Sequence, residues 1–424
     1  MLDINRIRSN PEHVKEALLK RMEHVDFTEL LQWDIERRQL IQSTDEKKAK
    51  RNKVSGDIPR LKKEGIDISD LLSEMKALSD EIKENDEALR EVDAKIHQFL
   101  SSLPNIPAED VVAGGKENNQ VLRTWGEKPS FGFSIKNHVD LATDLKLVDY
   151  ERGAKIGGNG FWVYTGMGSI LEWALLNYFV EQHLKDGYQF LLPPHILTYQ
   201  CGYTAGQFPK FTEDVYKVET GEANENMQFI LPTAETALIN YHRNEIMKEE
   251  DLPKKYFAYT PCYRKEAGSY RSEERGMIRG HQFNKVEMFH YTTPEQSETA
   301  FEELVVKAEK LVQGLGLYHR VSKLAAKDCS ASMGKTFDIE VWIPSMNDFK
   351  EVSSASNAYD YQARRGNIRF KGANGKSKFV HTLNASGLAT SRIMPAILEQ
   401  YQQADGSVVV PEVLRKWVGK EILR

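Results

Sequence analysis

The chain carries the sequence CYRKEAGS at residues 262–269 and RGMIRGHQFNKVE at residues 275–287. Charged and apolar residues alternate on both sides of a stretch with Gly and Ser, which predicts two antiparallel strands joined by a long polar loop. Because side chains alternate between the faces of a strand, Arg264 and Glu266 are expected to share a face, as are Lys285 and Glu287. A sheet face with these charges is poorly suited to a core and well suited to a charged, planar ligand such as a nucleotide.

The composition is that of a globular chain with two or three domains. The sequence has 424 residues and a net charge of -5, so its overall charge does not favour nucleic acid. The sequence contains no run of about 18 apolar residues, so no membrane-spanning helix is expected. The N-terminus lacks the layout of a signal peptide. Three cysteines, at positions 201, 262 and 329, predict neither a disulfide framework nor a zinc site. We therefore expect a cytoplasmic protein without zinc.

Residues 27–100 contain very little Gly or Pro and predict a long antiparallel helical hairpin, a coiled coil that projects from the body. An alternating four-three spacing marks its seam. The seam residues are Leu71, Met75, Leu78, Ile82, Asn85, Leu89, Val92, Ile96 and Phe99. Gly65 is the expected helix stop in the connecting turn. Pro59, near the tip, is expected to end or kink the first helix.

The two halves of this hairpin carry opposite charge. Residues 37–63 hold ten Lys and Arg against three acids, and residues 67–93 hold ten acids against three bases. One interpretation is a pair of helices made complementary by their charges. The other is a basic helix that contacts the phosphate backbone of a structured RNA, because few aromatic residues are available for base stacking. The pattern alone leaves both open.

Residues 104–110 form a linker by composition, so the expected domains are 1–103 and 104–424. Helices are expected at 169–184 and 297–315. Strands are expected at 189–192, 228–232, 255–261, 282–291, 337–343, 350–356 and 378–384. Their connections favour hairpins over repeated strand-helix-strand units, which predicts an α+β fold with a mainly antiparallel sheet flanked by helices. No phosphate loop or GxGxxG fingerprint is present.

Taken together, these segments resemble the class II aminoacyl-tRNA synthetases, and within that class the seryl-tRNA synthetase family, over nearly the whole chain. The class motifs match the helix 170–184 with the strand ending at Pro194, the stretch 262–287, and NASGLATSR at 384–392. The marks of the family are PTAE at 232–235, EVSS at 351–354 and QARR at 362–365. The helical arm belongs to the same picture.

The resemblance implies a class II catalytic domain at 104–424 and a tRNA-binding arm at 1–103. It implies that L-serine is activated with ATP and Mg²⁺ to seryl-adenylate and then transferred to the 3′ end of tRNA(Ser). It also implies tRNA(Sec) as a further partner of the arm and a homodimer formed through motif 1.

The resemblance also assigns site residues. Arg264 and Arg392 are the implied catalytic residues. ATP binding is assigned to Arg264, Lys265, Glu266, Arg279, Phe283, Glu351, Val352, Ser353, Ser354 and Arg392. Serine binding is assigned to Thr233, Ala234, Glu235, Arg264, Glu287, Asn384 and Ser386. Glu351 and Ser354 are the implied magnesium ligands, because this hard cation prefers oxygen.

The sequence departs from the family pattern in the motif 2 loop at 270–274, at Ala385 and at Thr390-Ser391. The loop usually contacts the tRNA acceptor end, so transfer is the step that these departures affect most. They lead to the hypothesis of an active, diverged second copy with altered sensitivity to serine-analogue inhibitors.

Two rival functions remain. The first, loading an amino acid onto a carrier protein, is disfavoured by the arm. The second, a non-catalytic RNA-binding paralogue, is disfavoured by the intact Arg264, Glu266, Glu351 and Arg392.

Overall fold

The structure is a computed structural model that describes residues 1–219, 227–266, 276–373 and 375–424. The chain divides into two compact units, Leu2–Pro104 and Asn105–Arg424, with Met1 counted with the second. The unusual motif 2 loop at 270–274 lies outside the described residues. No described helix has both the length and the hydropathy needed to cross a membrane.

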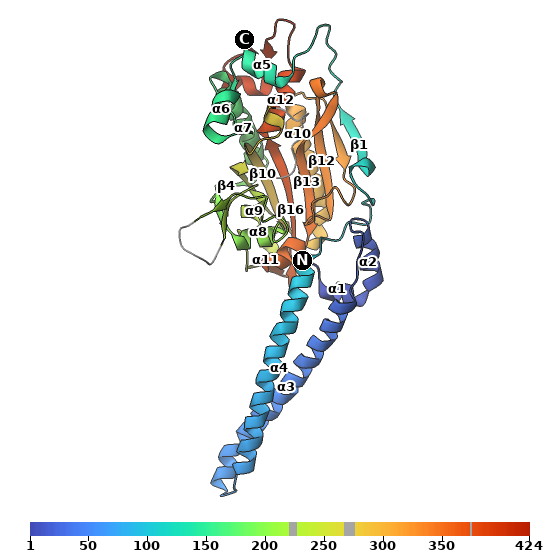
Figure 1. Cartoon of the computed structure of the whole chain (residues 1–424), viewed down its shortest axis with the longest axis vertical. Coiled ribbons are helices and arrows are strands. Elements are labelled where there is room, and N and C mark those ends of the chain that lie inside the picture. The colour runs from blue at the N-terminus through green and yellow to red at the C-terminus, as the bar shows by residue number, and fades with distance from the viewer. Residues whose placement is uncertain (220–226, 267–275, 374) are drawn as a thin grey trace. The chain divides into compact units, whose positions relative to one another are not determined.

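The first unit is helical. Its elements are α1 (Ile4–Ser9), α2 (Pro11–Leu19), α3 (Thr28–Lys63) and α4 (Ser69–Ser102). The two long helices α3 and α4 form the predicted hairpin (Figure 1). On the α4 seam, Leu78, Ile82, Val92 and Ile96 are buried, and Asn85 donates to the Ser43 hydroxyl at 3.3 Å. The four-three spacing therefore identified the packed face of α4 correctly.

The tip of the hairpin differs from the prediction in one respect. Gly65 follows α3 with φ 73°, as expected of a helix stop. Pro59 does not end the helix, which continues to Lys63. A proline removes one backbone hydrogen bond. Pro59 lies about one helical turn before the end of α3, and the loss of one bond there does not end the helix.

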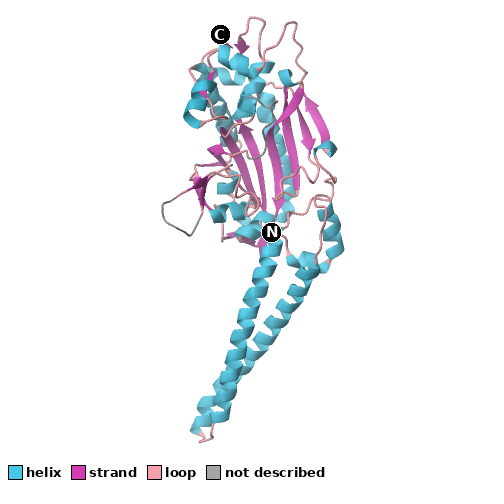
Figure 2. Ribbon diagram, viewed as in Figure 1, coloured by secondary structure: helices cyan, strands magenta, loops and turns pink. Residues whose placement is uncertain are grey.

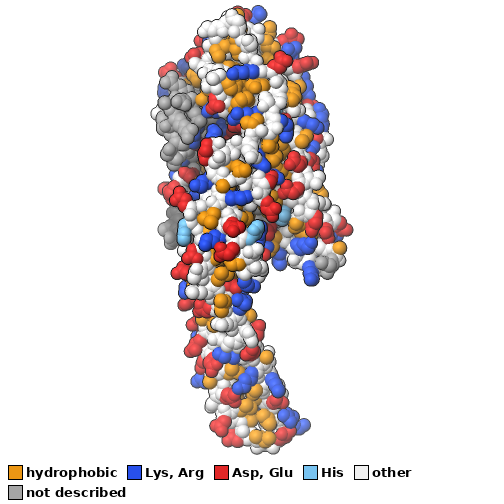
Figure 3. All heavy atoms as spheres, turned by 90° about the vertical axis from the view of Figure 1, so that its right-hand side faces the viewer, with side chains coloured by type: hydrophobic (Ala, Val, Ile, Leu, Met, Phe, Trp, Pro, Cys, Tyr) orange, Lys and Arg blue, Asp and Glu red, His pale blue; other side chains and the backbone are white. Residues whose placement is uncertain are grey.

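Ion pairs connect α3 to α4. Arg37 pairs with Asp93 at 2.6 Å, Lys47 with Glu81 at 2.8 Å, and Lys50 with Glu74 at 2.5 Å. Exposed pairs of this kind contribute about 0–1 kcal/mol each, so they help to set the register more than the stability. Figure 3 shows acidic and basic side chains mixed on one face of the hairpin. The charge-complementary interpretation therefore accounts for part of the basic helix.

The second unit is built on an eight-stranded sheet with the order β1-β11-β12-β13-β16-β10-β9-β4 (Figure 2). These strands are β1 (Gln120–Trp125), β4 (Gln189–Leu191), β9 (Lys254–Tyr263), β10 (Gln282–Thr292), β11 (His319–Lys323), β12 (Lys335–Ile343), β13 (Asp348–Tyr359) and β16 (His381–Ala389). All neighbours are antiparallel except β4 and β9. The predicted mainly antiparallel sheet is confirmed.

Helices and short strands surround this sheet. The helices are α5 (His138–Asp144), α6 (Tyr150–Gly157), α7 (Met167–Lys185), α8 (Tyr199–Ala205), α9 (Glu235–Leu238), α10 (Ser297–Gly314), α11 (Tyr361–Gly366), α12 (Thr390–Gln400) and α13 (Arg415–Val418). The short strands are β2 (Val148–Asp149), β3 (Val163–Tyr164), β5 (Ile196–Thr198), β6 (Lys217–Val218), β7 (Gln228–Ile230), β8 (Ile246–Lys248), β14 (Arg369–Lys371), β15 (Ser377–Phe379), β17 (Val408–Val409) and β18 (Ile422–Leu423).

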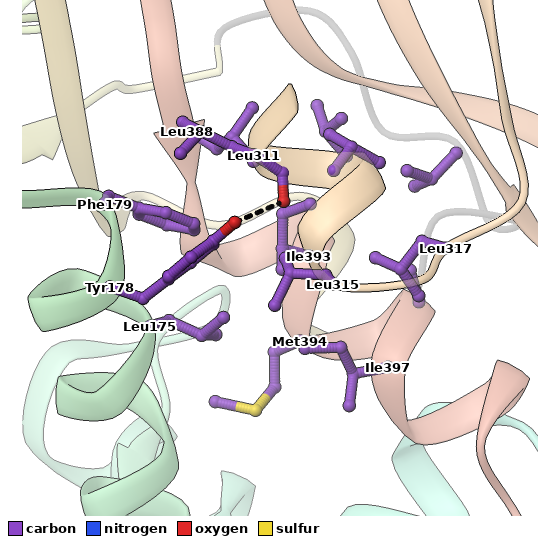
Figure 4. Packing of buried hydrophobic residues seen from close by; sticks show 14 of the residues in the cluster. Leu175, Tyr178, Phe179, Leu311, Leu315, Leu317, Leu388, Ile393, Met394 and Ile397 are labelled. Atoms are coloured by element: carbon purple, nitrogen blue, oxygen red, sulfur yellow. Dashed lines mark hydrogen bonds between the residues drawn. The ribbon is translucent and has the colours of Figure 1, made fainter. Parts of the chain in front are cut away.

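The main core joins α7, α10 and α12 to the sheet. Figure 4 shows Phe179 of α7, Leu311 of α10, and Leu388 and Ile393 from the end of β16 and the start of α12 packed together. The Tyr178 hydroxyl donates to the Leu311 carbonyl at 3.3 Å, which satisfies its polar tip inside apolar surroundings. This core supports the strands and the helix that carry the candidate site.

Two local expectations were wrong. The strand expected at 378–384 is split into β15 and β16. In the 262–287 segment, β9 already ends at Tyr263, so Arg264 and Glu266 do not alternate along a strand. Glu266 instead has φ 51°, a left-handed conformation that is uncommon for residues other than glycine.

Candidate active site

The paired strands β9 and β10 present Arg264 and Phe283 together. Phe283 lies opposite Cys262 in the ladder, and the Arg264 guanidinium lies 5.3 Å from the centre of the Phe283 ring. The Arg264 main chain donates to the His281 carbonyl at 2.9 Å, and its Nε donates to the Pro232 carbonyl at 3.3 Å. These contacts aim a planar cation across an aromatic face.

Arg279 and Glu266 form an ion pair beside Arg264. An Arg279 terminal nitrogen lies 2.6 Å from Glu266 Oε2, and its Nε donates to the same oxygen at 2.9 Å. Both side chains remain partly exposed, at 29% and 22%, so a ligand can reach them. Lys265 donates its backbone N–H to the Asp214 carbonyl at 3.2 Å.

Arg392, the third residue of α12, approaches the same place from motif 3. Its Nη1 donates to the Glu351 carbonyl at 2.8 Å and its Nε to the Ile278 carbonyl at 3.3 Å. The Glu351 carboxylate lies 3.4 Å from Nη1. The guanidinium is therefore positioned by two backbone acceptors and one charge.

One small cavity of about 50 Å³ brings most of these side chains together. Its lining comprises Arg264, Glu266, Ile278, Arg279, Gly280, Phe283, Lys285, Glu351, Val352, Ser386, Ala389, Ser391 and Arg392. Of the residues assigned to ATP, Lys265, Ser353 and Ser354 are not part of this lining. Ser353 is buried and donates its hydroxyl to the Ser386 carbonyl at 2.6 Å, which joins β13 to β16.

Beneath Lys285 and Ser386 lies a buried polar cluster. Glu287 is fully buried and accepts from Asn384 Nδ2 at 2.9 Å and from Ser386 Oγ at 3.5 Å. Lys285 Nζ lies 2.6 Å from Glu287 Oε2 and 2.7 Å from Thr233 Oγ1. A buried charge is tolerated only with such compensation, so these groups form one interdependent set.

Glu235 completes this cluster from the start of α9. Ala234, the buried residue before α9, sets the entry of the helix, and Gln362 donates to Glu235 Oε1 at 2.7 Å. Burial, and then the nearby Glu287 charge, raise the pKa of Glu235 to about 7. Lys285 is among the groups that oppose this rise.

A larger cavity of about 370 Å³ adjoins Arg392 and Glu351. Its carboxyl groups come from Asp328, Asp338, Glu340 and Glu351. Ser354 Oγ donates to Asp338 Oδ1 at 2.7 Å. Burial, and then the Glu351 charge, raise the pKa of Asp338 well above its ordinary value. Glu351 and Ser354 both line this cavity and carry oxygen ligands, the kind that a hard divalent cation prefers, so their chemistry is compatible with the implied magnesium. Among the described residues, no group of three or more His, Cys, Asp or Glu side chains could hold a metal by itself.

The residues of these sites that carry no assignment from the sequence include Lys285, Gln362 and Asp338. Lys285 shares the alternating pattern with Glu287, so the signal was available. Gln362 lies within the QARR mark, but its contact with Glu235 joins positions 127 residues apart. Asp338 was missed because its importance comes only from its cross-strand partner Ser354.

The motif 3 strand requires glycine at 387. A Cβ there would lie 2.3 Å from His183 Nε2, which is closer than real atoms approach. His183 is buried and its Nε2 donates to the Gly387 carbonyl at 3.1 Å. Burial lowers the pKa of His183 to about 4, so the ring is neutral at physiological pH.

The chain is similar to known proteins over its full length. The model of the class II tRNA synthetase core domain for G, H, P, S and T matches residues 216–401, and the model of the seryl-tRNA synthetase N-terminal domain matches residues 1–107. Serine–tRNA ligase 2 of Clostridium acetobutylicum is 63% identical over 100% of both chains. Serine–tRNA ligase of Thermodesulfovibrio yellowstonii is 46% identical, also over 100% of both.

Solved structures agree with these matches. Seryl-tRNA synthetase from Pyrococcus horikoshii, complexed with ATP, has a TM-score of 0.92 and 35% identity over 100% of this chain and 99% of that one. Cytoplasmic serine–tRNA ligase from Naegleria fowleri, in complex with AMP, has a TM-score of 0.87 and 28% identity over the same shares. This chain therefore belongs to the seryl-tRNA synthetase family of class II aminoacyl-tRNA synthetases.

Proposed function

We propose that this protein is a serine–tRNA ligase, which activates L-serine with ATP and transfers it to the 3′ end of tRNA(Ser). The observation that carries this proposal is the small cavity, because the arginines assigned to ATP line it together with Lys285 and Ser386. Lys285 and Ser386 also belong to the buried polar cluster that contains Thr233, Glu287 and Asn384, which are assigned to serine. One cavity thus joins a nucleotide surface to an amino-acid pocket.

In the activation step, the serine carboxylate attacks the α-phosphorus of ATP, the bond from that phosphorus to the bridging oxygen breaks, and seryl-adenylate forms as pyrophosphate leaves. Both groups are anions, so the site must supply positive charge and alignment. The fork of Arg264 can bind a carboxylate oxygen and a phosphate oxygen together. Arg279 and Arg392 supply further positive charge to the phosphates, and Phe283 offers a ring face to the adenine.

Magnesium accompanies ATP in this proposal, held by Glu351 and Ser354. When bound, the cation neutralises charge on the phosphate oxygens. The hydrogen bond from Ser354 to Asp338 orients the serine hydroxyl so that an oxygen lone pair stays available. The protein's own contribution is thus an oriented oxygen pair beside Arg392.

Selection of serine depends on buried polar groups that need a partner. Asn384 Oδ1 is buried and has no hydrogen-bond partner among the described residues. A serine hydroxyl can donate to it, whereas the methyl group of alanine cannot. Sites with polar groups left unpaired reject such analogues strongly. Serine-dependent exchange of pyrophosphate into ATP tests the proposal, and exchange supported equally by alanine or threonine would contradict it.

Serine use is expected to weaken as the pH falls through about 7. We propose that the Glu235 carboxylate attracts the serine ammonium group. Its pKa is raised to about 7 by burial and by Glu287, while Gln362, Lys285 and Arg264 oppose that rise. Above this pH the carboxylate is charged and binds, and below it the protonated form does not.

The measurement is kcat/KM for serine in pyrophosphate exchange across about pH 5.5 to 8.5. Glu235→Gln should give a low value that does not change with pH in this range, while the KM for ATP serves as the control. A wild-type profile that is flat, or that falls as the pH rises through about 7, would contradict this role of Glu235.

We further propose that the hairpin binds tRNA(Ser), and tRNA(Sec) as a second substrate. The charges of Lys47, Lys48 and Lys50 are partly neutralised by their ion pairs with acidic residues of α4. Arg51, Lys53, Lys62 and Lys63 form no ion pair with the part of the chain that the structure describes. These cations cluster toward the tip, where they can contact phosphates.

We also propose a homodimer through the outer face of α7. Ile170, Trp173 and Leu184 share a helical face and are 42%, 56% and 52% exposed. Exposed apolar residues grouped on one face mark an interaction surface. Trp173→Glu is expected to convert a dimer into a monomer in sedimentation. A monomeric wild-type protein at micromolar concentration would contradict the proposal.

A cytoplasmic location remains a prediction from cysteine usage.

A further inference from the structure

Glu172 is a buried carboxyl that the proposed mechanism does not use. It lies on α7 with 3% of its surface exposed, beside the core residues Leu171, Ala174 and Leu175. Its Oε1 accepts from Asn284 Nδ2 at 2.8 Å and from Thr390 Oγ1 at 2.5 Å. Burial raises the pKa of Glu172, and hydrogen bonds with Thr390, Asn284 and Tyr164 act against that rise. Removing these donors would leave a buried carboxyl oxygen unsatisfied, which costs free energy.

Both donors belong to elements that form the site. Asn284 lies on β10 between Phe283 and Lys285, and Thr390 opens α12 two residues before Arg392. The neighbours of Thr390 in the chain, Ala389 and Ser391, line the small cavity. Glu172 therefore connects α7 to motifs 2 and 3 beneath the cavity.

The orientation of Asn284 is set by a third group. The Tyr259 hydroxyl donates to Asn284 Oδ1 at 3.1 Å, which leaves the amide nitrogen to face Glu172. The Thr390 hydroxyl also lies 3.2 Å from the Asn284 carbonyl. The side chains of Glu172, Asn284, Thr390 and Tyr259 form one hydrogen-bonded network, and networks of this kind fix geometry.

The first turn of α12 lacks two of the usual backbone constraints on a helix start. Its N-cap, Ala389, makes no side-chain capping bond, although the first N–H groups of a helix need partners. Pro395 lies inside the helix and has no N–H to donate to the Ser391 carbonyl. The contact between Thr390 and Glu172 thus anchors a turn that lacks two ordinary constraints.

We infer that Glu172 is a positioning residue that acts through Thr390 to place Arg392 for ATP. The inference rests on the proposed function and extends it to a residue outside the cavity. Arg392 reaches the Glu351 and Ile278 carbonyls from the third position of α12, so a shift of the first turn moves its guanidinium directly. Misplacement of a reacting group by about 1 Å can cost a hundredfold in rate.

The test compares Thr390→Val, which removes the hydroxyl at similar size, with Thr390→Ser, which retains it. Thr390→Val is expected to lower kcat/KM for ATP in pyrophosphate exchange by about ten- to a hundredfold, with the KM for serine nearly unchanged. Thr390→Ser should remain within about threefold of the wild type. Thr143→Val, which removes an exposed hydroxyl that bonds the Val139 carbonyl, is the matched control and should have no effect.

A double-mutant cycle isolates the coupling. Glu172→Met, which keeps the length of the side chain without an oxygen acceptor, should resemble Thr390→Val. The double variant should be little worse than either single variant, because each removes the same interaction. Losses that multiply would overturn the inference, as would equal effects of Val and Ser at position 390. A lower unfolding midpoint in Thr390→Val with unchanged ATP kinetics would show a merely structural role and also overturn it.

Direct ATP binding by calorimetry separates this inference from the proposed function. If the wild-type protein binds ATP but supports no serine-dependent exchange, the proposed function fails. The inference then stands if Thr390→Val weakens ATP binding while Thr390→Ser does not, and it fails if both bind like the wild type. Thr390→Ala, which adds no methyl group beside the carboxyl, replaces Thr390→Val if that variant does not fold.

Discussion

Replacing Arg264 with Gln is expected to lower kcat/KM for serine-dependent pyrophosphate exchange by about a thousandfold. Arg264 is the cation proposed to hold both anions during activation, and glutamine keeps much of its length without the charge or the fork. A factor of about a thousand corresponds to about 4 kcal/mol of transition-state stabilisation. The fold should survive, because among the described residues the side chain donates one hydrogen bond, to the Pro232 carbonyl, and lies over the Phe283 ring.

The matched control is Arg152→Gln. Arg152 is 77% exposed and pairs locally with Asp149, so its loss should leave exchange unchanged. Arg264→Lys should recover only part of the activity, because lysine keeps the charge and loses the bidentate geometry. A loss of less than about tenfold in Arg264→Gln would contradict the role assigned to this residue.

Shortening the helical hairpin is expected to abolish tRNA charging and to leave amino-acid activation intact. Deleting residues 52–77 and closing the helices with a short Gly-Ser loop removes Lys53, Lys62 and Lys63. It leaves the ion pair of Lys47 with Glu81 and the buried Leu78 and Ile82 in place. Loss of several phosphate contacts should lower kcat/KM for tRNA at least about a hundredfold.

The control for this variant is built into the reaction. Pyrophosphate exchange requires no tRNA, so it should match the wild type within about twofold. Charging by the wild type should also weaken with added salt, and the shortened variant should show a smaller salt dependence. A shortened protein that charges tRNA normally would contradict an RNA-binding role for the hairpin.

Local patterns predicted the helices better than the sheet. The seam from Leu71 to Phe99 was readable because residues that share a helix face recur every three or four positions. The order that places β16 between β13 and β10 was beyond reach, because it depends on contacts between segments far apart in the chain. The end of β9 at Tyr263 was also not predicted. Charged and apolar residues continue to alternate in the sequence beyond Tyr263, but the backbone leaves the strand there and Glu266 adopts a left-handed conformation.

In the candidate site, too, residues in local motifs were predicted and long-range contacts were not. Arg264, Phe283 and Arg392 were assigned from motifs, and the structure brings them to one cavity, although their individual roles remain proposals. Lys285 received no role although its alternation with Glu287 was visible in the sequence, because its contacts with Glu287 and Thr233 are visible only in the fold. Glu172 and Thr390 lie 218 residues apart, so nothing in either local sequence indicates their contact. Residues proposed to contact a ligand are thus easier to predict from the sequence than the residues that position their side chains.

The most direct test of the account is the attachment of labelled serine to the 3′ end of tRNA(Ser) by the purified full-length protein with ATP and Mg²⁺. The account predicts rapid formation of seryl-tRNA, with threonine and alanine at least about a hundredfold poorer. Serine-dependent pyrophosphate exchange without any seryl-tRNA would contradict it, and would favour a protein that loads its activated serine onto another carrier.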